Sequence, residues 1–199
     1  GCRPDPQSDL DTLLEQALYD ASQGEGRPHY QMPLDGNLGA IPADPRNPIT
    51  REKVELGKML FRETALGTQS KHADGMQTFS CASCHHVQAS FTAGREQGIG
   101  DGGLGFGVNG ESRRNNFAYQ MDSIDVQQIR SPTALNVAYQ TISLWTGQFG
   151  AGGVNAGTEA SWVYGKPTEA NHLGYQGPET QAIAGLKVHR LEVTSDLAQ

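Results

Sequence analysis

The sequence lacks an uninterrupted run of about 18 apolar residues, the length that a membrane-spanning helix requires, and no signal-peptide pattern is visible in it. Basic residues are also scarce, since 15 Lys and Arg stand against 22 Asp and Glu, giving a net charge of −7. Contacts with phosphate need clustered basic residues, so we expect no nucleic-acid binding. The negative charge instead suits a basic partner protein, because complementary charges speed encounter.

Aromatic residues make up only 7% of the 199 residues, and hydrophobic residues make up 36%. This is lean for one domain of ordinary size with an additional arm. A cofactor with an apolar surface of its own would help to fill such a core. The 25 glycines and 10 prolines predict that much of the chain is loop.

The apolar periodicity predicts an all-α fold with little strand. We expect helices over residues 8–23, 50–62, 131–145 and 179–191, with an extended connector over 24–48. Glycine-rich loops are expected over 94–110 and 147–177. The first of these is either packed closely against another part of the chain or a mobile flap. We expect an N-terminal arm over residues 1–48, made of a helix and the extended connector, and one main domain over residues 49–199.

Two of the three cysteines stand three positions apart in the stretch "CASCHH". Cys-x-x-Cys-His is the pattern for covalent attachment of haem. Each thiol adds to one vinyl group of the porphyrin, and the histidine that follows binds the iron. The motif therefore predicts one haem c, with Cys81 and Cys84 as its thioether anchors and His85 as the proximal metal ligand.

Other interpretations of the cysteine pair stay open at this point. A thioredoxin-like redox pair would lie in a βαβ pattern, which is missing here. A zinc site would need a second pair of ligands at suitable spacing. A disulfide between Cys81 and Cys84 would be strained by the short spacing.

Four stretches in order carry a resemblance to a known family: "ELGKMLFRE", "FSCASCHHVQASFTAG", "IRSPTALNVAYQ" and "LWTG". Together they resemble the N-terminal half of bacterial di-haem cytochrome c peroxidases, which include the enzyme that matures methylamine dehydrogenase. The resemblance spans about Ile49 to Leu191. It implies an all-α c-type cytochrome domain whose haem reduces hydrogen peroxide. It also implies a second haem domain that takes electrons from a small cytochrome or cupredoxin, and a tryptophan between the haems, which matches Trp145.

The sequence departs from the family pattern at several positions. It has one Cys-x-x-Cys-His where the family has two, so we expect the second domain to be absent from this chain. In "IGDG", Asp101 stands where peroxidases of the family often have a histidine, which implies an open iron position. Arg130 stands where the family has an asparagine of its calcium site. Calcium is therefore doubtful, and Arg130 is expected to replace its charge or to bind a haem propionate.

The family also has a glutamate that moves a proton between the two peroxide oxygens. The corresponding segment here is similar to "TQAIAGLKVHRL". In this segment His189 is the expected base, and Arg190 is expected to stabilise the departing negative charge. Gln181 is expected to add a hydrogen bond, and Glu179 is a weaker rival for the acid–base role.

Two functions of different classes follow. The first is the peroxidatic haem domain of a di-haem enzyme, with oxidation of a protein side chain as a variant of that activity. The second is a mono-haem electron carrier, for which Met121 is the best candidate as sixth iron ligand. Haem is attached to such motifs outside the bacterial cytoplasm, so we expect a periplasmic protein. The start "GCRPDP" is similar to that of mature bacterial lipoproteins, which predicts a membrane tether through a lipid on Cys2.

Overall fold

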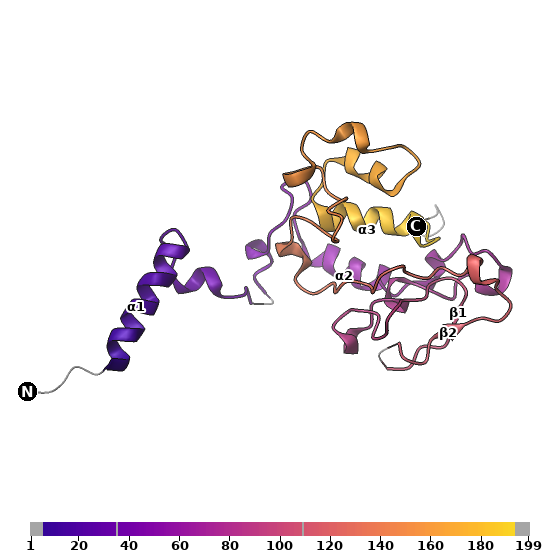
Figure 1. Cartoon of the computed structure of the whole chain (residues 1–199), viewed down its shortest axis with the longest axis horizontal. Helices are drawn as coiled ribbons and strands as arrows, with labels where there is room; N and C mark the ends of the chain where they lie inside the picture. The colour runs from indigo at the N-terminus through magenta and orange to yellow at the C-terminus, as the bar shows by residue number, and fades with distance from the viewer. Residues whose placement is uncertain (1–5, 35, 109, 194–199) are drawn as a thin grey trace, which may run out of the picture. The chain divides into compact units, whose positions relative to one another are not determined.

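The computed structural model describes residues 6–34, 36–108 and 110–193, and the chain divides into two compact units, residues 1–40 and 41–199. In the first unit, helix α1 (Pro6–Ala21) precedes single 3₁₀ turns at Arg27–Tyr30 and Leu38–Ala40 (Figure 1). The helix expected over 8–23 is therefore present. Within the described ranges, no helix is both long and apolar enough to cross a membrane.

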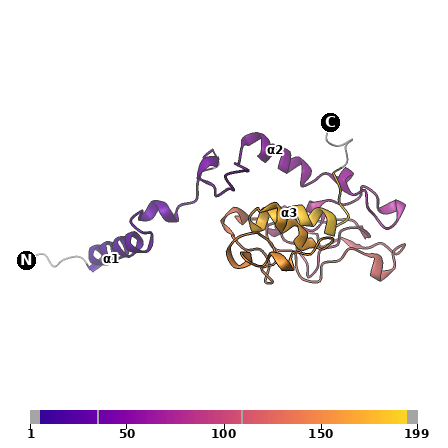
Figure 2. The same cartoon turned by 90° about the horizontal axis from the view of Figure 1, so that it is seen from above.

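The second unit contains helices α2 (Arg51–Leu60) and α3 (Gly177–Val188), connected by loops and many short 3₁₀ turns. Two short strands, β1 (Gly103–Leu104) and β2 (Arg114–Asn115), form an antiparallel pair. The turned view shows α3 lying across the orange loops that precede it (Figure 2). It packs there against the 3₁₀ segment Pro167–Leu173. The expectation of a mostly helical domain with little strand is confirmed.

Helix α2 begins where the sequence predicts. Thr50 caps it, because its hydroxyl oxygen accepts a hydrogen bond from the backbone N–H of Lys53 at 3.3 Å. The helix ends at Leu60, and the N–H of Phe61 bonds the carbonyl of Gly57 at 2.9 Å. None of the α2 side chains is buried, although the helix carries several large apolar ones: Leu56, Met59 and Leu60. The residues that the structure describes therefore leave its apolar side largely uncovered.

Helix α3 ends in a Schellman motif. Arg190 adopts the left-handed conformation with φ of 58°, and the N–H of Leu191 bonds the carbonyl of Leu186 at 2.8 Å. This motif usually brings its two flanking apolar residues into contact. Here Leu191 is buried in a cluster with Leu66 and Phe79, and Leu186 packs against the same cluster. The contact of Leu186 and Leu191 with this cluster holds the left-handed turn at Arg190 in place.

The helix expected over 131–145 is wrong. The segment holds one 3₁₀ turn, Val137–Tyr139, in a largely extended run. Asn136 and Leu144 have φ values of 56° and 63°, which a right-handed helix does not allow. The hydroxyl of Thr133 donates to the carbonyl of Ser90 at 2.5 Å. Ser90 lies in the loop that follows the Cys-x-x-Cys-His motif, so a contact with this loop takes the place of helical hydrogen bonds.

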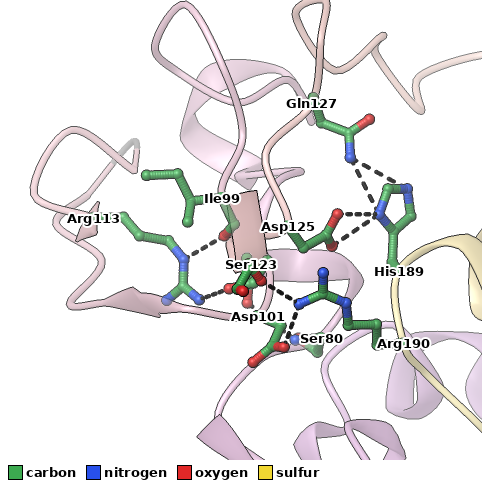
Figure 3. Close-up of polar contacts among 11 residues, drawn as sticks. Ser80, Ile99, Asp101, Arg113, Ser123, Asp125, Gln127, His189 and Arg190 are labelled. Atoms are coloured by element: carbon green, nitrogen blue, oxygen red, sulfur yellow. Dashed lines mark hydrogen bonds and ion pairs between the residues drawn. The ribbon is translucent and has the colours of Figure 1, made fainter. Parts of the chain in front are cut away.

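The glycine-rich stretch over 94–110 packs closely around the side chain of Arg113, which is only 2% exposed. The guanidinium donates to the carbonyl of Ile99 (Figure 3). It also donates to the carbonyls of Gly100 and Gly105, at 2.7 and 3.2 Å. A Cβ on Gly103 would lie 2.6 Å from Nε of Arg113, so no side chain fits there. Close packing is therefore observed over residues 98–103, which are buried, whereas residues 104–108 are exposed.

Candidate haem site

The two cysteines of the motif lie on one tight turn. Cys81–Ser83 forms a 3₁₀ turn that is braced by a hydrogen bond from the Ser80 N–H to the Ser83 hydroxyl at 3.0 Å. Cys81 and Cys84 are both half-buried free thiols, so no disulfide joins them. Burial raises the pKa of both thiols, and for Cys84 burial together with the nearby Asp125 carboxylate raises it to about 12. Both cysteines are therefore neutral thiols at neutral pH.

His85 is oriented by its own loop. Its Nδ1 lies 2.8 Å from the carbonyl oxygen of Phe91, to which it donates a hydrogen bond. The other ring nitrogen, Nε2, then keeps its lone pair for a metal. Burial lowers the pKa of His85 below its usual value of 6.5, and the neighbouring charge of His189 lowers it further. The imidazole is therefore neutral at neutral pH, which is the form that binds metals.

These residues fit a covalently bound haem. The motif supplies two reduced thiols and a neutral imidazole, which is the donor set that haem c requires. The N–H of Ala82 bonds the carbonyl of Phe61 at 3.0 Å, so the motif lies at the end of α2. The uncovered apolar side chains of that helix suit a flat apolar group as their cover.

The protein also packs tightly behind Cys84. A Cβ built on Gly98 would lie 2.8 Å from the sulfur of Cys84 and 2.9 Å from the hydroxyl oxygen of Ser131. That hydroxyl is buried and has no hydrogen-bond partner within the described residues. Cys81, in turn, packs against the apolar cluster at the end of α3. Both attachment points are thus anchored on well-packed parts of the unit.

His189 lies at the C-terminal end of α3 and contacts two polar side chains (Figure 3). Its Nδ1 is 3.0 Å from Oδ2 and 3.3 Å from Oδ1 of Asp125. The amide nitrogen of Gln127 lies 3.1 and 3.3 Å from the two ring nitrogens. Asp125 and Gln127 are 64 and 62 residues away in sequence and were not predicted as site residues. No local pattern in the sequence marks either of them.

Arg190 points into a buried network of its own (Figure 3). Its Nη1 donates to Oδ2 of Asp101 at 2.6 Å and to the carbonyl of Ser123 at 2.7 Å. Asp101 is fully buried and also accepts hydrogen bonds from the Tyr119 hydroxyl and the Lys71 N–H. Burial by itself raises the pKa of Asp101, but these hydrogen bonds outweigh it, so the pKa lies below its ordinary value of 3.8. The catalytic role expected for Arg190 stays a prediction, and the guanidinium has a structural partner.

The remaining residues singled out by the sequence are exposed or half-buried. Trp145 is fully exposed and is therefore not a core aromatic. Arg130 is exposed, with its guanidinium 3.4 Å from the hydroxyl of Thr92. Gln181 lies half-buried in α3. Their expected roles stay predictions.

Two further candidates are held by polar neighbours. Met121 is exposed, and its sulfur accepts a hydrogen bond from the Asn115 amide at 3.5 Å. Glu179 accepts a hydrogen bond from the Asn47 amide at 2.7 Å. Cys2 lies outside the described residues. In the part of the chain that is described, no group of three or more His, Cys, Asp and Glu side chains could hold a metal ion.

Comparison with known proteins gives one match. A sequence model of the family described as di-haem cytochrome c peroxidase matches residues 51–190. The matched region contains α2, the haem motif and α3, and it ends at Arg190. No curated protein and no solved structure matches the chain.

Proposed function

Because the chain belongs to the di-haem cytochrome c peroxidase family, we propose that it is a peroxidatic haem domain that reduces hydrogen peroxide. Family membership itself indicates a haem-dependent oxidoreductase. The finer proposal is supported by one observation above all. The imidazole of His189 lies 3.0 Å from the carboxylate of Asp125, and its charge contributes, after burial, to the lowered pKa of His85. Such a pair is suited to moving a proton beside a bound iron.

The chain's own residues have distinct roles in this proposal. Cys81 and Cys84 hold the porphyrin by thioether bonds, and His85 binds the iron through Nε2. When bound, the haem supplies the iron at which the oxygen–oxygen bond of peroxide is broken. His189 accepts the proton of one peroxide oxygen and returns it to the other, which leaves as water. Two electrons and two protons per peroxide give two waters.

The electrons come from outside this chain in the proposal. Trp145 has its whole side chain at the surface, which leaves it available to a second haem domain. That domain would receive electrons from a small cytochrome or cupredoxin. The negative net charge of the chain favours a basic donor. The tryptophan would then lie in the path between the two haems.

The optical spectrum of the ferric protein tests the proposal against the electron-carrier alternative. The protein should be produced in a bacterial periplasm, where haem is attached. A peroxidatic domain is expected to give a high-spin spectrum, because its open iron face binds peroxide. A low-spin spectrum that Met121→Ala converts to high-spin would identify an electron carrier instead.

A turnover assay tests the enzyme claim directly. The protein, together with its second haem domain, should oxidise a reduced cytochrome only when peroxide is present. The matched control is the Cys81→Ala, Cys84→Ala variant, which cannot attach haem and should show neither a Soret band nor turnover. If the haem-loaded protein does not react with peroxide, the proposal is wrong.

The same proposal includes a periplasmic location and a lipid on Cys2, as the motif and the start of the sequence predict. Mass spectrometry of the N-terminal peptide from native membranes tests the lipid. A peptide carrying diacylglycerol would support the tether, and an unmodified peptide would exclude it.

A further inference from the structure

We infer that Asp125 is the positioning residue for His189, and that the two act as a His189–Asp125 pair in proton transfer to and from peroxide. This inference rests on the proposed function and names a residue that its chemistry requires. Asp125 lies in the loop after β2 and does not belong to any motif in the sequence. The carboxylate reaches His189 from a segment 64 residues away.

The geometry of the pair fixes the chemical form of the imidazole. Nδ1 of His189 lies within 3.3 Å of both carboxylate oxygens of Asp125, so Nδ1 carries the proton and donates it. Nε2 is then the basic nitrogen. The amide nitrogen of Gln127 lies 3.1 Å from Nδ1 and 3.3 Å from Nε2 (Figure 3), and because Nδ1 is protonated the amide can donate only to Nε2. Nε2 is therefore the acceptor nitrogen of the ring, and peroxide reaches it by displacing the Gln127 amide.

Both partners are held by backbone contacts. The Schellman motif at Arg190 fixes the end of α3, and with it the direction of the His189 side chain. On the other side, the N–H of Asp125 bonds the carbonyl of Asp101 at 2.9 Å, and its carbonyl accepts from the N–H of Gly100 at 2.8 Å. The pair is therefore set up by the fold before any substrate binds, which is the preorganisation that proton transfer requires.

Exposure and surroundings also suit a proton-transfer pair. The Asp125 side chain is 11% exposed, whereas that of His189 is 31% exposed. The carboxylate is largely shielded from solvent, while the imidazole is open to a small molecule. A Cβ on Gly98 would lie 2.8 Å from the sulfur of Cys84, and one on Gly100, two positions on, would clash with Oδ2 of Asp125. The same short segment thus packs against both Cys84 and Asp125, and Asp125 contributes to the raised pKa of Cys84.

The proton that the pair moves is conserved, and the second oxygen of peroxide becomes water with two electrons from the donor and two protons from solvent. Nε2 of His189 accepts one proton from peroxide, and the imidazolium that forms is stabilised by the negative charge of Asp125. The same proton is then given to the departing oxygen, which leaves as water. The two electrons come from the donor through the second haem. Asp125 keeps its charge throughout and exchanges no proton.

The test compares Asp125→Asn with Asp122→Asn in the haem-loaded protein. Both changes remove one carboxylate charge, and Asp122 is exposed, where its carboxylate accepts a hydrogen bond from the hydroxyl of the neighbouring Ser123 at 3.2 Å. The first measurement is the rate of reaction with peroxide in a single turnover. The second is the rate at which hydrogen cyanide binds the ferric iron, because it must give up its proton to bind.

We expect Asp125→Asn to slow both rates by about 10²-fold, within the contribution typical of general acid–base catalysis. Asp122→Asn should change neither, and Asp125→Glu should recover part of the loss. The Soret band and the covalent haem mass should be the same in all variants. Equal rates in Asp125→Asn and Asp122→Asn would overturn the inference, because a merely structural ion pair predicts that result.

A measurement on the unchanged protein covers the case in which Asp125→Asn fails to fold. In the diamagnetic ferrous carbon monoxide form, ¹⁵N NMR of the histidine rings should show His189 protonated at Nδ1 with a hydrogen bond to carboxylate. Protonation at Nε2 alone would overturn the inference. If the wild-type protein binds cyanide rapidly but does not react with peroxide, the proposed function fails while the pair itself stands.

Discussion

Replacement of Arg190 should destabilise the protein strongly, because its guanidinium is paired with a fully buried carboxylate. Arg190 donates to Asp101 at 2.6 Å, and the Asp101 side chain has no exposed surface. Removing one partner of a buried ion pair leaves an uncompensated charge and typically costs about 3–5 kcal/mol. Tyr119 and the Lys71 N–H still bond Asp101, so we expect Arg190→Ala to lie at the lower end, about 3 kcal/mol.

The backbone at Arg190 adds a second, separable contribution. Its φ of 58° lies in the left-handed region, where a residue with a Cβ is disfavoured by about 1–2 kcal/mol relative to glycine. Arg190→Ala keeps this strain and loses the ion pair, whereas Arg190→Gly loses the ion pair and relieves the strain. We therefore expect Arg190→Gly to be about 1 kcal/mol more stable than Arg190→Ala.

Urea unfolding of the haem-loaded protein, followed by circular dichroism, measures both differences. Lys187→Ala is the matched control, since Lys187 also lies at the end of α3 but forms an exposed ion pair with Glu169 at 3.6 Å. Such pairs contribute about 0–1 kcal/mol. A loss in Arg190→Ala no larger than that in Lys187→Ala would refute the structural role of the ion pair. Equal free energies of unfolding for Arg190→Gly and Arg190→Ala would refute the backbone strain proposed at position 190.

Three further predictions concern acid stability, haem attachment and electron transfer. The pKa of Asp101 is lowered in the folded protein, so ionised Asp101 stabilises the fold fully above its ordinary pKa of 3.8, and this stabilisation is lost as the pH falls below that value. Asp101→Asn should therefore make the free energy of unfolding, measured by urea titration, less dependent on pH in this acid range. Gly98→Ala should displace the sulfur of Cys84 and reduce the covalent haem seen by mass spectrometry, whereas Gly185→Ala, with nothing within 4 Å, should not. Trp145→Phe should change the free energy of unfolding by less than about 0.5 kcal/mol, because the side chain is exposed, yet slow electron delivery in stopped-flow reduction by the donor.

The parts of the structure that the sequence predicts are those encoded over short distances. Thr50 is followed by an apolar helical pattern, and the structure has a capped helix there. The segment after Asn136 shows the limit of such reasoning, because its apolar spacing suits a helix. Left-handed residues and a hydrogen bond from Thr133 to the Ser90 carbonyl hold it extended instead. Tertiary contacts override local preference at that point.

The candidate site divides in the same way. Cys81, Cys84 and His85 lie within one motif, so their chemistry can be inferred from spacing alone. The neighbours of His189 come from a distant loop, and only the fold places Asp125 against it. Arg190 follows His189 directly, but its side chain pairs with the carboxylate of Asp101 and not with that of Asp125. The two side chains point in different directions because the backbone adopts the left-handed conformation at Arg190.

Because the Schellman motif fixes the end of α3, the number of residues in that helix determines whether His189 faces Asp125. Each residue of an α-helix advances the side-chain direction by about 100°. Inserting a single alanine into α3 would leave every side chain identical but swing the imidazole away from its carboxylate. Natural variants of this domain should tolerate substitutions along α3 far more readily than a change in its residue count.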